Sequence, residues 1–407
     1  MLPVEALSMA LLISKAKIPS NTEKSLQTLQ HKKQQHPVMK KVLIIANKAS
    51  TLLTFRLDMM KEFQKSAYDV VCCAPDSPVD FESKLAAFGI SYKRVPMERN
   101  GMNPFADLKS FYALYQLILK LRPDKIFAYT AKPVIYGGLA AQLAGNTEFY
   151  PMICGLGSAF RTANIKTKLV KFILSAEYKL ALKCCKRVMF QNHDDAGEFV
   201  KARIVREEQC CFTCGSGVNC KQFTLSPFPE NISFIMIARL IGDKGVREYL
   251  QACKKVKQSN PTVRFLLIGP FDTNPSAITP EELQPYIDDE SVEYKGEQAD
   301  VRPYLMESSV FVLPSYHEGT PKSTLEAMAM GRPVITTDAP GCKETVKDSR
   351  NGFLVPVKNS NAIADKMQWF IEHSEAILSM GIESRRIAVE VFDVQKVNKA
   401  IMQIMKI

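Results

Sequence analysis

Short apolar runs alternate along the chain with longer segments in which apolar residues recur at helical spacing. The runs predict buried strands and the longer segments predict amphipathic helices. In the first half, strands are expected at 41–47, 68–75, 124–129, 148–154, 187–192 and 210–213. Helices are expected between them at 55–66, 80–89, 103–123, 133–145 and about 166–185. Apolar strands separated by helices indicate a parallel, doubly wound sheet.

The same alternation restarts after residues 226–231, "SPFPEN", whose two prolines and turn formers predict a linker. Further strands are expected at 232–240, 263–270, 310–315 and 333–338. Further helices are expected at 246–258, 300–309 and 321–331, with two or three more before the end. The pattern predicts an α/β protein with a first domain at 39–225, a second at 226–392, and a C-terminal helix at 393–407 that packs back on the first domain. In such pairs of domains a ligand binds at the carboxyl ends of the strands.

Residues 1–38 end in the polar, unpatterned "HKKQQHPV" and are expected to be an extension without fixed structure. The first domain begins at "MKKVLIIA", so translation from Met1 and from Met39 are both open. The apolar patch near the start follows Glu5 and has no cationic leader, which is atypical of a signal peptide. Eleven cysteines without regular spacing indicate a reducing, cytoplasmic compartment.

Positive charge is concentrated in the first half of the chain. Residues 39–217 hold 26 Lys/Arg and 16 Asp/Glu, whereas residues 218–407 hold 22 and 24. A basic half indicates an anionic partner, such as nucleic acid or a phospholipid surface. A solvated face with no special role is the alternative.

Two glutamates eight residues apart, Glu318 and Glu326, provide the candidate chemistry. Glu318 falls in the loop after an apolar strand, where ligands bind in open α/β sheets. The next helix is expected to begin at Thr320 or Pro321, and its free N–H groups form an anion site. A carboxylate suits paired sugar hydroxyls, and Gly319 lets a ligand approach the backbone. Taken singly, each glutamate reads as a helix N-terminal charge or a surface residue.

The stretch "EGTPKSTLEAMAMGRPVITTDAPGCKETVKDSRNGFLVP" resembles the E-x7-E signature of the family 4 retaining glycosyltransferases, which have the GT-B fold of two Rossmann-like domains facing across a cleft. "ARLIGDKGV" resembles the phosphate loop of that family. The resemblance implies that Arg239 and Lys244 hold the donor's diphosphate, where fixed cations stabilise the developing charge. It also implies that Glu318 contacts the transferred sugar, that Glu326 contacts the ribose, and that Gly269 in "LLIGP" lies at a nucleotide-side turn. Gly319 and Thr320 are counted with the donor-binding residues.

No D-x-D motif follows a strand, so a metal-independent site without a cofactor is expected. In this family the leaving phosphate is thought to help deprotonate the acceptor, so we nominate no nucleophile. Hydrolysis by the glutamate pair is disfavoured because both lie on one side of one element. The segment "CCFTCGSGVNC" reads as a strand and a turn rather than a zinc site. His193 and His317 lack partners at ligand spacing, although the place of His317 beside Glu318 makes it a weaker candidate for a substrate contact.

The first half resembles a narrower branch, the bacterial enzymes that extend polyprenyl-diphosphate-linked sugars for surface polysaccharides or glycoprotein glycans. "NGMNPFADL", "YTAKPVIYGGLAA", "ICGLGSAF" and Arg56 in "TFR" carry this resemblance. It implies acceptor-side roles for Arg56, Lys132, Gly155 and Gly157. A surface lysine and a plain turn are the alternatives for Lys132 and the glycine pair. The first loop, "NKASTLLTF", lacks G-x-G-x-x-G, which disfavours a dinucleotide oxidoreductase.

The segment "NIKTKLVKFILSAEYKLALKCCKRV" carries seven Lys/Arg and one glutamate among apolar residues. Basic amphipathic helices of this kind lie on anionic membrane surfaces, and a core helix with a solvated basic face is the alternative. The candidate membrane-facing residues are Lys168, Lys171, Lys179 and Lys183. No nucleic-acid-binding motif accompanies the charge, so a nucleic-acid partner is not expected.

The sequence therefore predicts a retaining glycosyltransferase, peripheral to the cytoplasmic face of the cell membrane. It is expected to move a hexose or N-acetylhexosamine from a nucleotide sugar, expected to be UDP-linked, to a polyprenyl-linked glycan acceptor. A GT-B-type sugar-nucleotide epimerase and a non-catalytic nucleotide-binding scaffold are the alternatives. The E-x7-E stretch disfavours the first, and the intact set of Glu318, Glu326, Arg239 and Lys244 disfavours the second.

Overall fold

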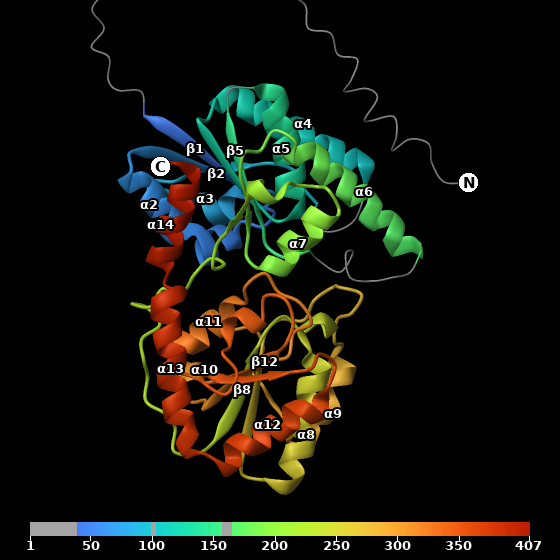
Figure 1. Ribbon diagram of the computed structural model, residues 1–407, viewed down its shortest axis with the longest axis vertical. Helices are drawn as coiled ribbons and strands as arrows, with labels where there is room; N and C mark the ends of the chain where they lie inside the picture. Colours follow the sequence, from blue (N-terminus) through green and yellow to red (C-terminus); the bar gives the residue numbers. More distant parts are fainter. Residues whose placement is uncertain (1–38, 99–102, 146, 157–164) are drawn as a thin grey trace, which may run out of the picture.

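The computed structural model describes residues 39–98, 103–145, 147–156 and 165–407 (Figure 1). The expected N-terminal extension, residues 1–38, and the acceptor-side candidate Gly157 lie outside the described residues. Figure 1 shows two α/β domains one above the other, with the last two helices running along one side of both.

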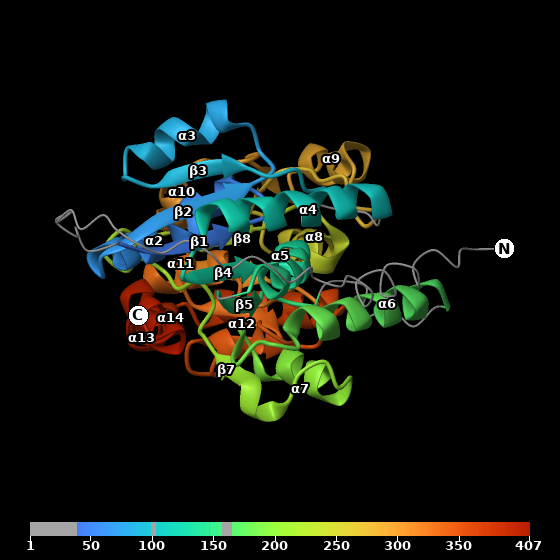
Figure 2. The same ribbon diagram turned by 90° about the horizontal axis from the view of Figure 1, so that it is seen from above.

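The first domain is built on a seven-stranded parallel sheet with the order β3-β2-β1-β4-β5-β6-β7. Its strands are β1 (Lys40–Ile45), β2 (Tyr68–Ala74), β3 (Ser91–Arg94), β4 (Lys125–Tyr129), β5 (Glu148–Ile153), β6 (Val188–Phe190) and β7 (Cys210–Phe212). Its helices are α2 (Leu57–Lys65), α3 (Pro78–Ala86), α4 (Pro104–Leu121), α5 (Ala131–Ala144), α6 (Ile165–Leu182) and α7 (His193–Lys201). A π-helical turn, η1 (Leu52–Arg56), precedes α2. Figure 2 shows α3 and α7 at opposite ends of this sheet.

Both faces of the first sheet are covered, which explains why β1 is apolar from Val42 to Ile45. Leu43 and Ile45 belong to the apolar cluster that α4, α5, α6 and α7 complete. Val42 and Ile44 belong to the cluster on the other face, completed by α2 and α3. Successive side chains of a strand point to opposite faces, so a strand between two helical layers must be apolar at every position.

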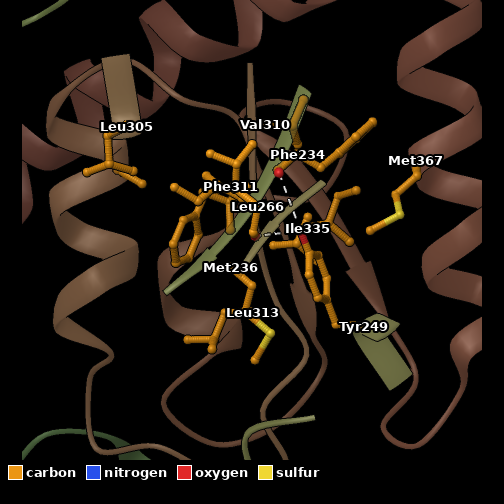
Figure 3. Close-up of a cluster of buried hydrophobic side chains, with 14 of the residues drawn as sticks. Phe234, Met236, Tyr249, Leu266, Leu305, Val310, Phe311, Leu313, Ile335 and Met367 are labelled. Atoms are coloured by element: carbon orange, nitrogen blue, oxygen red, sulfur yellow. Dashed lines mark hydrogen bonds between the residues drawn. The ribbon is translucent and has the colours of Figure 1, made fainter. Parts of the chain in front are cut away.

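The second domain is built on a six-stranded parallel sheet with the order β10-β9-β8-β11-β12-β13. Its strands are β8 (Ser233–Ile237), β9 (Arg264–Ile268), β10 (Glu293–Tyr294), β11 (Val310–Leu313), β12 (Val334–Thr337) and β13 (Gly352–Val355). The helices of this half are α8 (Val246–Ser259), α9 (Pro280–Asp288), α10 (Arg302–Met306), α11 (Lys322–Ala329), α12 (Ser360–Glu372), α13 (Glu375–Val391) and α14 (Val394–Met405). Figure 3 shows side chains from β8, β9, β11 and β12 packed together, with Tyr249 donating to the carbonyls of Phe234 and Leu266 at 3.3 and 2.9 Å.

The two sheets confirm the expected GT-B fold class, but several elements differ from the prediction. Three strands were missed, namely β3, β10 and β13, and so were α7 and α9. In β3 only Tyr92 is buried, so this edge strand reads as polar. Helix α9 contains Pro285, which reads as a loop. The helix expected at 321–331 is shorter, because Pro321 is its extended N-cap and the helix begins at Lys322.

The last helix returns to the first domain. In α14 the apolar residues Val397, Ile401 and Met405 join the cluster that contains Met60 of α2. The chain therefore passes between the domains twice, and the two passages are hydrogen-bonded to each other. Val218 N donates to Phe392 O at 2.8 Å, and Val394 N donates to Val218 O at 2.9 Å.

Candidate active site

Glu318 lies in the loop that follows β11, at the carboxyl edge of the second sheet. Its amide donates to Pro340 O at 2.8 Å. Gly341 has a φ of +79°, and a Cβ there would overlap the Glu318 carbonyl. The loop after β12 therefore holds the Glu318 backbone closely, which only a glycine at position 341 allows.

Lys244 forms an ion pair with Glu318, and both side chains are largely buried. The lysine ends a short 3₁₀ turn after β8, and Gly245 follows with a φ of +73°. A Cβ at Gly245 would overlap the Pro314 carbonyl. This close packing against the end of β11 brings Lys244 within reach of Glu318.

Arg239 belongs to the same loop but pairs with a different carboxylate, Asp272, at 2.8 Å. The Arg239 side chain is 42% exposed. Gly269 has a φ of +147°, and a Cβ there would overlap the Ala238 carbonyl. Gly269 thus brings the loop after β9, which carries Asp272, against the loop after β8.

Glu326 lies on α11, and burial raises its pKa to about 7. The positive charge of Lys322 opposes this shift, and the carboxylate of Asp300 adds to it. Lys322, the first residue of α11, donates to Gly217 O at 2.8 Å. Burial lowers the pKa of Lys322. The two glutamates therefore differ. Glu318 is ion-paired, whereas Glu326, with a pKa of about 7, is partly protonated at neutral pH.

The first domain contacts the Glu318 loop directly through the carboxyl ends of β5 and β6. Asn192 Nδ2 donates to Glu318 O at 3.1 Å and to Gly319 O at 3.3 Å. Gly155, with a φ of +104°, faces Gly319, because a Cβ on it would lie 3.4 Å from Gly319 N. Thr320 Oγ1 donates to Gln191 O at 3.5 Å. The two carboxyl edges therefore meet at this loop.

Two further contacts join the domains, and neither was predicted from the sequence. His317 Nε2 lies 2.8 Å from Asp195 Oδ1, and both side chains are buried. Lys343 Nζ lies 2.8 Å from Asp194 Oδ2. His317 has no partner at ligand spacing in the sequence, but its neighbour in space comes from the other domain. The only sequence signal was the polar run "QNHDD" directly after a strand.

The remaining described acceptor-side candidates are Lys132, which is paired within the first domain, and Arg56, which lies at the carboxyl edge of the first sheet. Lys132 forms an ion pair with Asp107 at 2.7 Å, and both side chains are about 15% exposed or less. A lone surface lysine is therefore the wrong description of Lys132. Arg56 is buried at the carboxyl edge of the first sheet. Within the described ranges, no group of three or more His, Cys, Asp or Glu could hold a metal ion.

Helix α6 presents both charge and apolar surface. Lys168, Lys179 and Lys183 are exposed, whereas Lys171 lies 3.5 Å from Glu198 of α7. Leu169, Phe172 and Leu180 are exposed on the same helix. In the described part of the chain, no helix is both long enough and apolar enough to span a bilayer.

Two facing parallel-sheet domains with acid and cationic groups at their meeting carboxyl edges define the class as GT-B. The chain belongs to the glycosyltransferases. The family model "Glycosyl transferase 4-like" matches residues 41–192, and "Glycosyl transferases group 1" matches residues 231–373, so the two together span most of the chain. The protein is accordingly a transferase enzyme.

Named relatives are found among bacterial glycan-assembly enzymes. The chain is 27% identical to the N,N'-diacetylbacillosaminyl-diphospho-undecaprenol alpha-1,3-N-acetylgalactosaminyltransferase of Campylobacter jejuni, over 85% of this chain and 93% of the relative. It is 25% identical to the UDP-Gal:alpha-D-GlcNAc-diphosphoundecaprenol alpha-1,3-galactosyltransferase of Escherichia coli, over 67% and 73%. Among solved structures, Anabaena HepE in complex with UDP-glucose is similar in fold, with a TM-score of 0.72, 20% identity and coverage of 90% and 99%.

Proposed function

We propose that the enzyme transfers a hexose or N-acetylhexosamine from a UDP-sugar to a polyprenyl-diphosphate-linked saccharide, with retained configuration, in bacterial surface glycan synthesis. The observation that carries the proposal is the Glu318–Lys244 pair at the meeting edges of two GT-B sheets. The names of the Campylobacter jejuni and Escherichia coli relatives support the lipid-linked acceptor. The donor in the HepE complex supports UDP.

The donor binds by exchange of partners in this proposal. Lys244 leaves Glu318 for the donor's diphosphate, and the freed carboxylate accepts hydrogen bonds from the transferred sugar. Arg239 leaves Asp272 in the same way, which its 42% exposure favours. Glu326 accepts from the ribose. The backbone at Gly269, Gly319 and Thr320 lines the donor side.

Fixed cations act on the reaction because the departing diphosphate gains charge in the transition state. Groups already aimed at that charge need no reorganisation when it develops. The leaving phosphate then takes the proton of the acceptor hydroxyl on the face where the sugar is transferred, so the bond to the leaving group breaks as the new bond forms.

The acceptor's lipid places the enzyme at a membrane in this proposal, peripheral to its cytoplasmic face. The exposed lysines of α6 suit anionic headgroups, and its exposed Leu169, Phe172 and Leu180 suit the interface below them. We expect the triple variant Lys168→Ser, Lys179→Ser, Lys183→Ser to float less with vesicles containing phosphatidylglycerol. The control is a triple serine variant of Lys65, Lys84 and Lys93, which are exposed on α2, α3 and β3. If the two triple variants float equally well, the lysines of the α6 region have no special role in membrane binding.

The test of the function is a thermal-shift panel of UDP, GDP, ADP and their sugar conjugates, with and without EDTA, followed by transfer assays. A nucleotide at about 100 times its Kd adds about 2.7 kcal/mol to stability. We expect a shift with the UDP series that survives EDTA, and donor turnover only with a polyprenyl-diphosphate sugar present. The anomeric proton coupling of the product reports retention. Turnover without acceptor would indicate an epimerase, and binding without turnover would indicate a scaffold.

A further inference from the structure

Arg56 is a buried arginine whose direct contacts, among the described residues, are sulfur atoms and aromatic rings. It ends the π-helical turn η1 and is 2% exposed. Its guanidinium carbon lies 4.8 Å from the ring centre of Tyr129 and 5.4 Å from that of Phe127. Nη2 donates to the sulfur of Met152 at 3.1 Å and lies 4.0 Å from the sulfur of Cys154.

Among the described residues, no carboxylate forms an ion pair with Arg56. Its Nε has no hydrogen-bond partner among these residues, and its Nη2 contacts the sulfurs of Met152 and Cys154. Asp58, two residues further on, instead accepts a hydrogen bond from Asn219 at 3.3 Å. Thioether and thiol sulfurs are weak acceptors for a group with five N–H donors.

Fold stability gives no reason for an arginine at this position. Burying an ion is strongly unfavourable when no opposite charge compensates it. Contacts with two aromatic rings offset only part of this cost. The balance is unfavourable, so the guanidinium is better explained by an anion that binds beside it.

The neighbourhood of Arg56 is suited to such an anion. Cys154 lies beside Gly155, which faces Gly319 of the second domain. Burial lowers the pKa of Lys322, the carboxylates of Glu326 and Asp58 oppose this shift, and the charge of Arg56 adds to it. The N-terminus of α11, an eight-residue helix, begins at Lys322. Arg56 thus lies where two cations and a helix N-terminus meet between the domains.

Unused polar atoms mark the same edge of the first sheet. Thr130 Oγ1 follows β4 and Thr213 Oγ1 follows β7, and both are buried without a hydrogen-bond partner in the described part of the chain. Thr324 Oγ1 in the first turn of α11 is likewise buried and unpartnered. Buried polar atoms are rarely left unsatisfied, and these hydroxyls are available to hydrogen-bond a polar ligand.

We propose that Arg56 binds a phosphate of a diphosphate and is the first domain's contribution to that contact. The proposal rests on the proposed function, in which both the donor and the lipid-linked acceptor carry a diphosphate. Arg239 and Lys244 belong to the second domain, so a diphosphate that also meets Arg56 draws the two edges together. Because Arg56 is closed off from solvent in this state, the ligand enters when the domains separate about the two chain passages.

The test uses the full chain with Arg56→Met, which removes the charge and keeps the bulk, and Arg56→Lys, which keeps the charge without the planar fork. Calorimetry measures the affinities for UDP, UMP and inorganic pyrophosphate. Steady-state assays at saturating donor measure KM for the polyprenyl-diphosphate sugar. The control is Arg264→Met, since Arg264 pairs with Glu293 at 2.7 Å away from the cleft.

We expect Arg56→Met to lose at least tenfold in affinity for a diphosphate, with an intermediate loss in Arg56→Lys. Without ligand its Tm should equal or exceed that of the wild type, because an uncompensated buried charge is removed. A loss for UDP that is smaller for UMP identifies the donor's diphosphate. Unchanged UDP affinity with a tenfold higher acceptor KM identifies the acceptor's diphosphate.

Unchanged UDP and pyrophosphate affinities together with an unchanged acceptor KM would overturn the proposal. So would a Tm that falls by several degrees in Arg56→Met, because the arginine would then be structural. The failure of the proposed function is distinct, since the wild type would then bind no UDP and transfer no sugar. In that case the pyrophosphate titration decides for Arg56: weaker binding in Arg56→Met supports the site, and equal or absent binding in both proteins overturns it.

Discussion

The cations at the two carboxyl edges that meet at the Glu318 loop have different surroundings. At the edge of the second sheet, Lys244 pairs with Glu318 and Arg239 pairs with Asp272. At the edge of the first sheet, Arg56 is surrounded by sulfur and aromatic rings. The two cations at the second edge already have carboxylate partners before any ligand arrives, whereas Arg56 at the first edge has no counterion among the described residues.

This difference separates two ways in which a protein binds an anion. A cation that already has a carboxylate partner exchanges one ion pair for another. Its side chain is positioned in advance, but the free energy of ligand binding gains only the difference between the two ion pairs. A cation without a partner gains the whole interaction and carries the cost of its burial until then. We therefore expect the second sheet's edge to determine the chemistry and the first sheet's edge to favour domain closure on the ligand.

The largest effect is expected when the paired edge loses its acid. Glu318→Gln should lower kcat by about 10²–10³, the range for removal of one preorganised electrostatic group. UDP affinity should be unchanged or higher, because Lys244 is freed for the diphosphate. Single-turnover assays and calorimetry measure the two quantities. The control is Glu282→Gln, which removes a carboxylate paired with Arg247 at 2.5 Å outside the cleft. A near-normal kcat in Glu318→Gln would show that Glu318 has no role in the reaction.

Removing the cation from the same pair should cost less in rate and more in binding. Lys244→Met loses a charge-assisted contact of about 1.5–3 kcal/mol, so UDP should bind about 10–100-fold more weakly. The matched control is Lys254→Met, because Lys254 pairs with Asp289 at 2.6 Å on the surface of the same domain. If Lys244→Met and Lys254→Met bind UDP equally well, the pairing with Glu318 has no role in donor binding.

Because burial raises the pKa of Glu326 to about 7, we expect donor binding to depend on pH. In the proposed function the carboxylate accepts both ribose hydroxyls, so affinity should rise with deprotonation, about tenfold from pH 6 to pH 8 for one group with this pKa. UDP-glucose is the suitable ligand because its diphosphate does not titrate in this range. Glu326→Gln should flatten the profile. An unchanged slope in that variant would assign the pH dependence to another group.

The raised pKa of Glu326 also makes the free energy of unfolding depend on pH, but this free energy should fall with rising pH while donor affinity rises. The folded protein holds the Glu326 proton up to about pH 7, whereas the unfolded chain releases it near the ordinary value of 4.5. Between these values the folded state binds more protons, so the free energy of unfolding falls as pH rises through this window. Glu326→Gln should remove this part of the slope in denaturant titrations at pH 5 and pH 7.

The smallest effect is expected from the contact that joins the two edges. Asn192→Ala removes two hydrogen bonds to the Glu318 and Gly319 carbonyls. We expect kcat to fall about 3–10-fold, from a loss of about 1 kcal/mol, with the donor KM little changed. Asn192 also caps α7, so stability should fall by about 1 kcal/mol. The control is Asn260→Ala, an asparagine that donates to Val256 O at 3.1 Å in the second domain. A larger effect on KM than on kcat would contradict a positioning role.

The sequence was sufficient for the loop that carries Glu318 and for all strands except the edge strands β3, β10 and β13. Residues of a strand that are covered on both faces are apolar, as in Val42–Ile45 of β1 and in β11, so their pattern is visible without the structure. Strand β3 has one buried residue and α9 contains a proline, so neither has a readable period. Edge elements are specified by their neighbours more than by their own residues.

Contacts within the site were less predictable than its location. Lys244 and Glu318 are 74 positions apart, and Asn192 and Glu318 are 126 apart, so only the fold brings them together. The family resemblance implied an acceptor-side role for Arg56, but the segment "TFRLD" does not predict that its side chain is buried. Its burial depends on Tyr129 and Met152 from two other strands, which no local pattern reveals.

Helix α14 has a consequence for the order in which the protein is made. Its apolar residues complete a core whose other members precede residue 190, yet α14 begins only at Val394. A ribosome adding about 5–20 residues each second needs roughly 10–40 seconds to synthesise the second domain in between. During that interval the face of α2 that α14 covers is exposed on the nascent chain. The first domain is therefore translated first, but its apolar core is completed last. A chaperone that shields α2 would act during this interval.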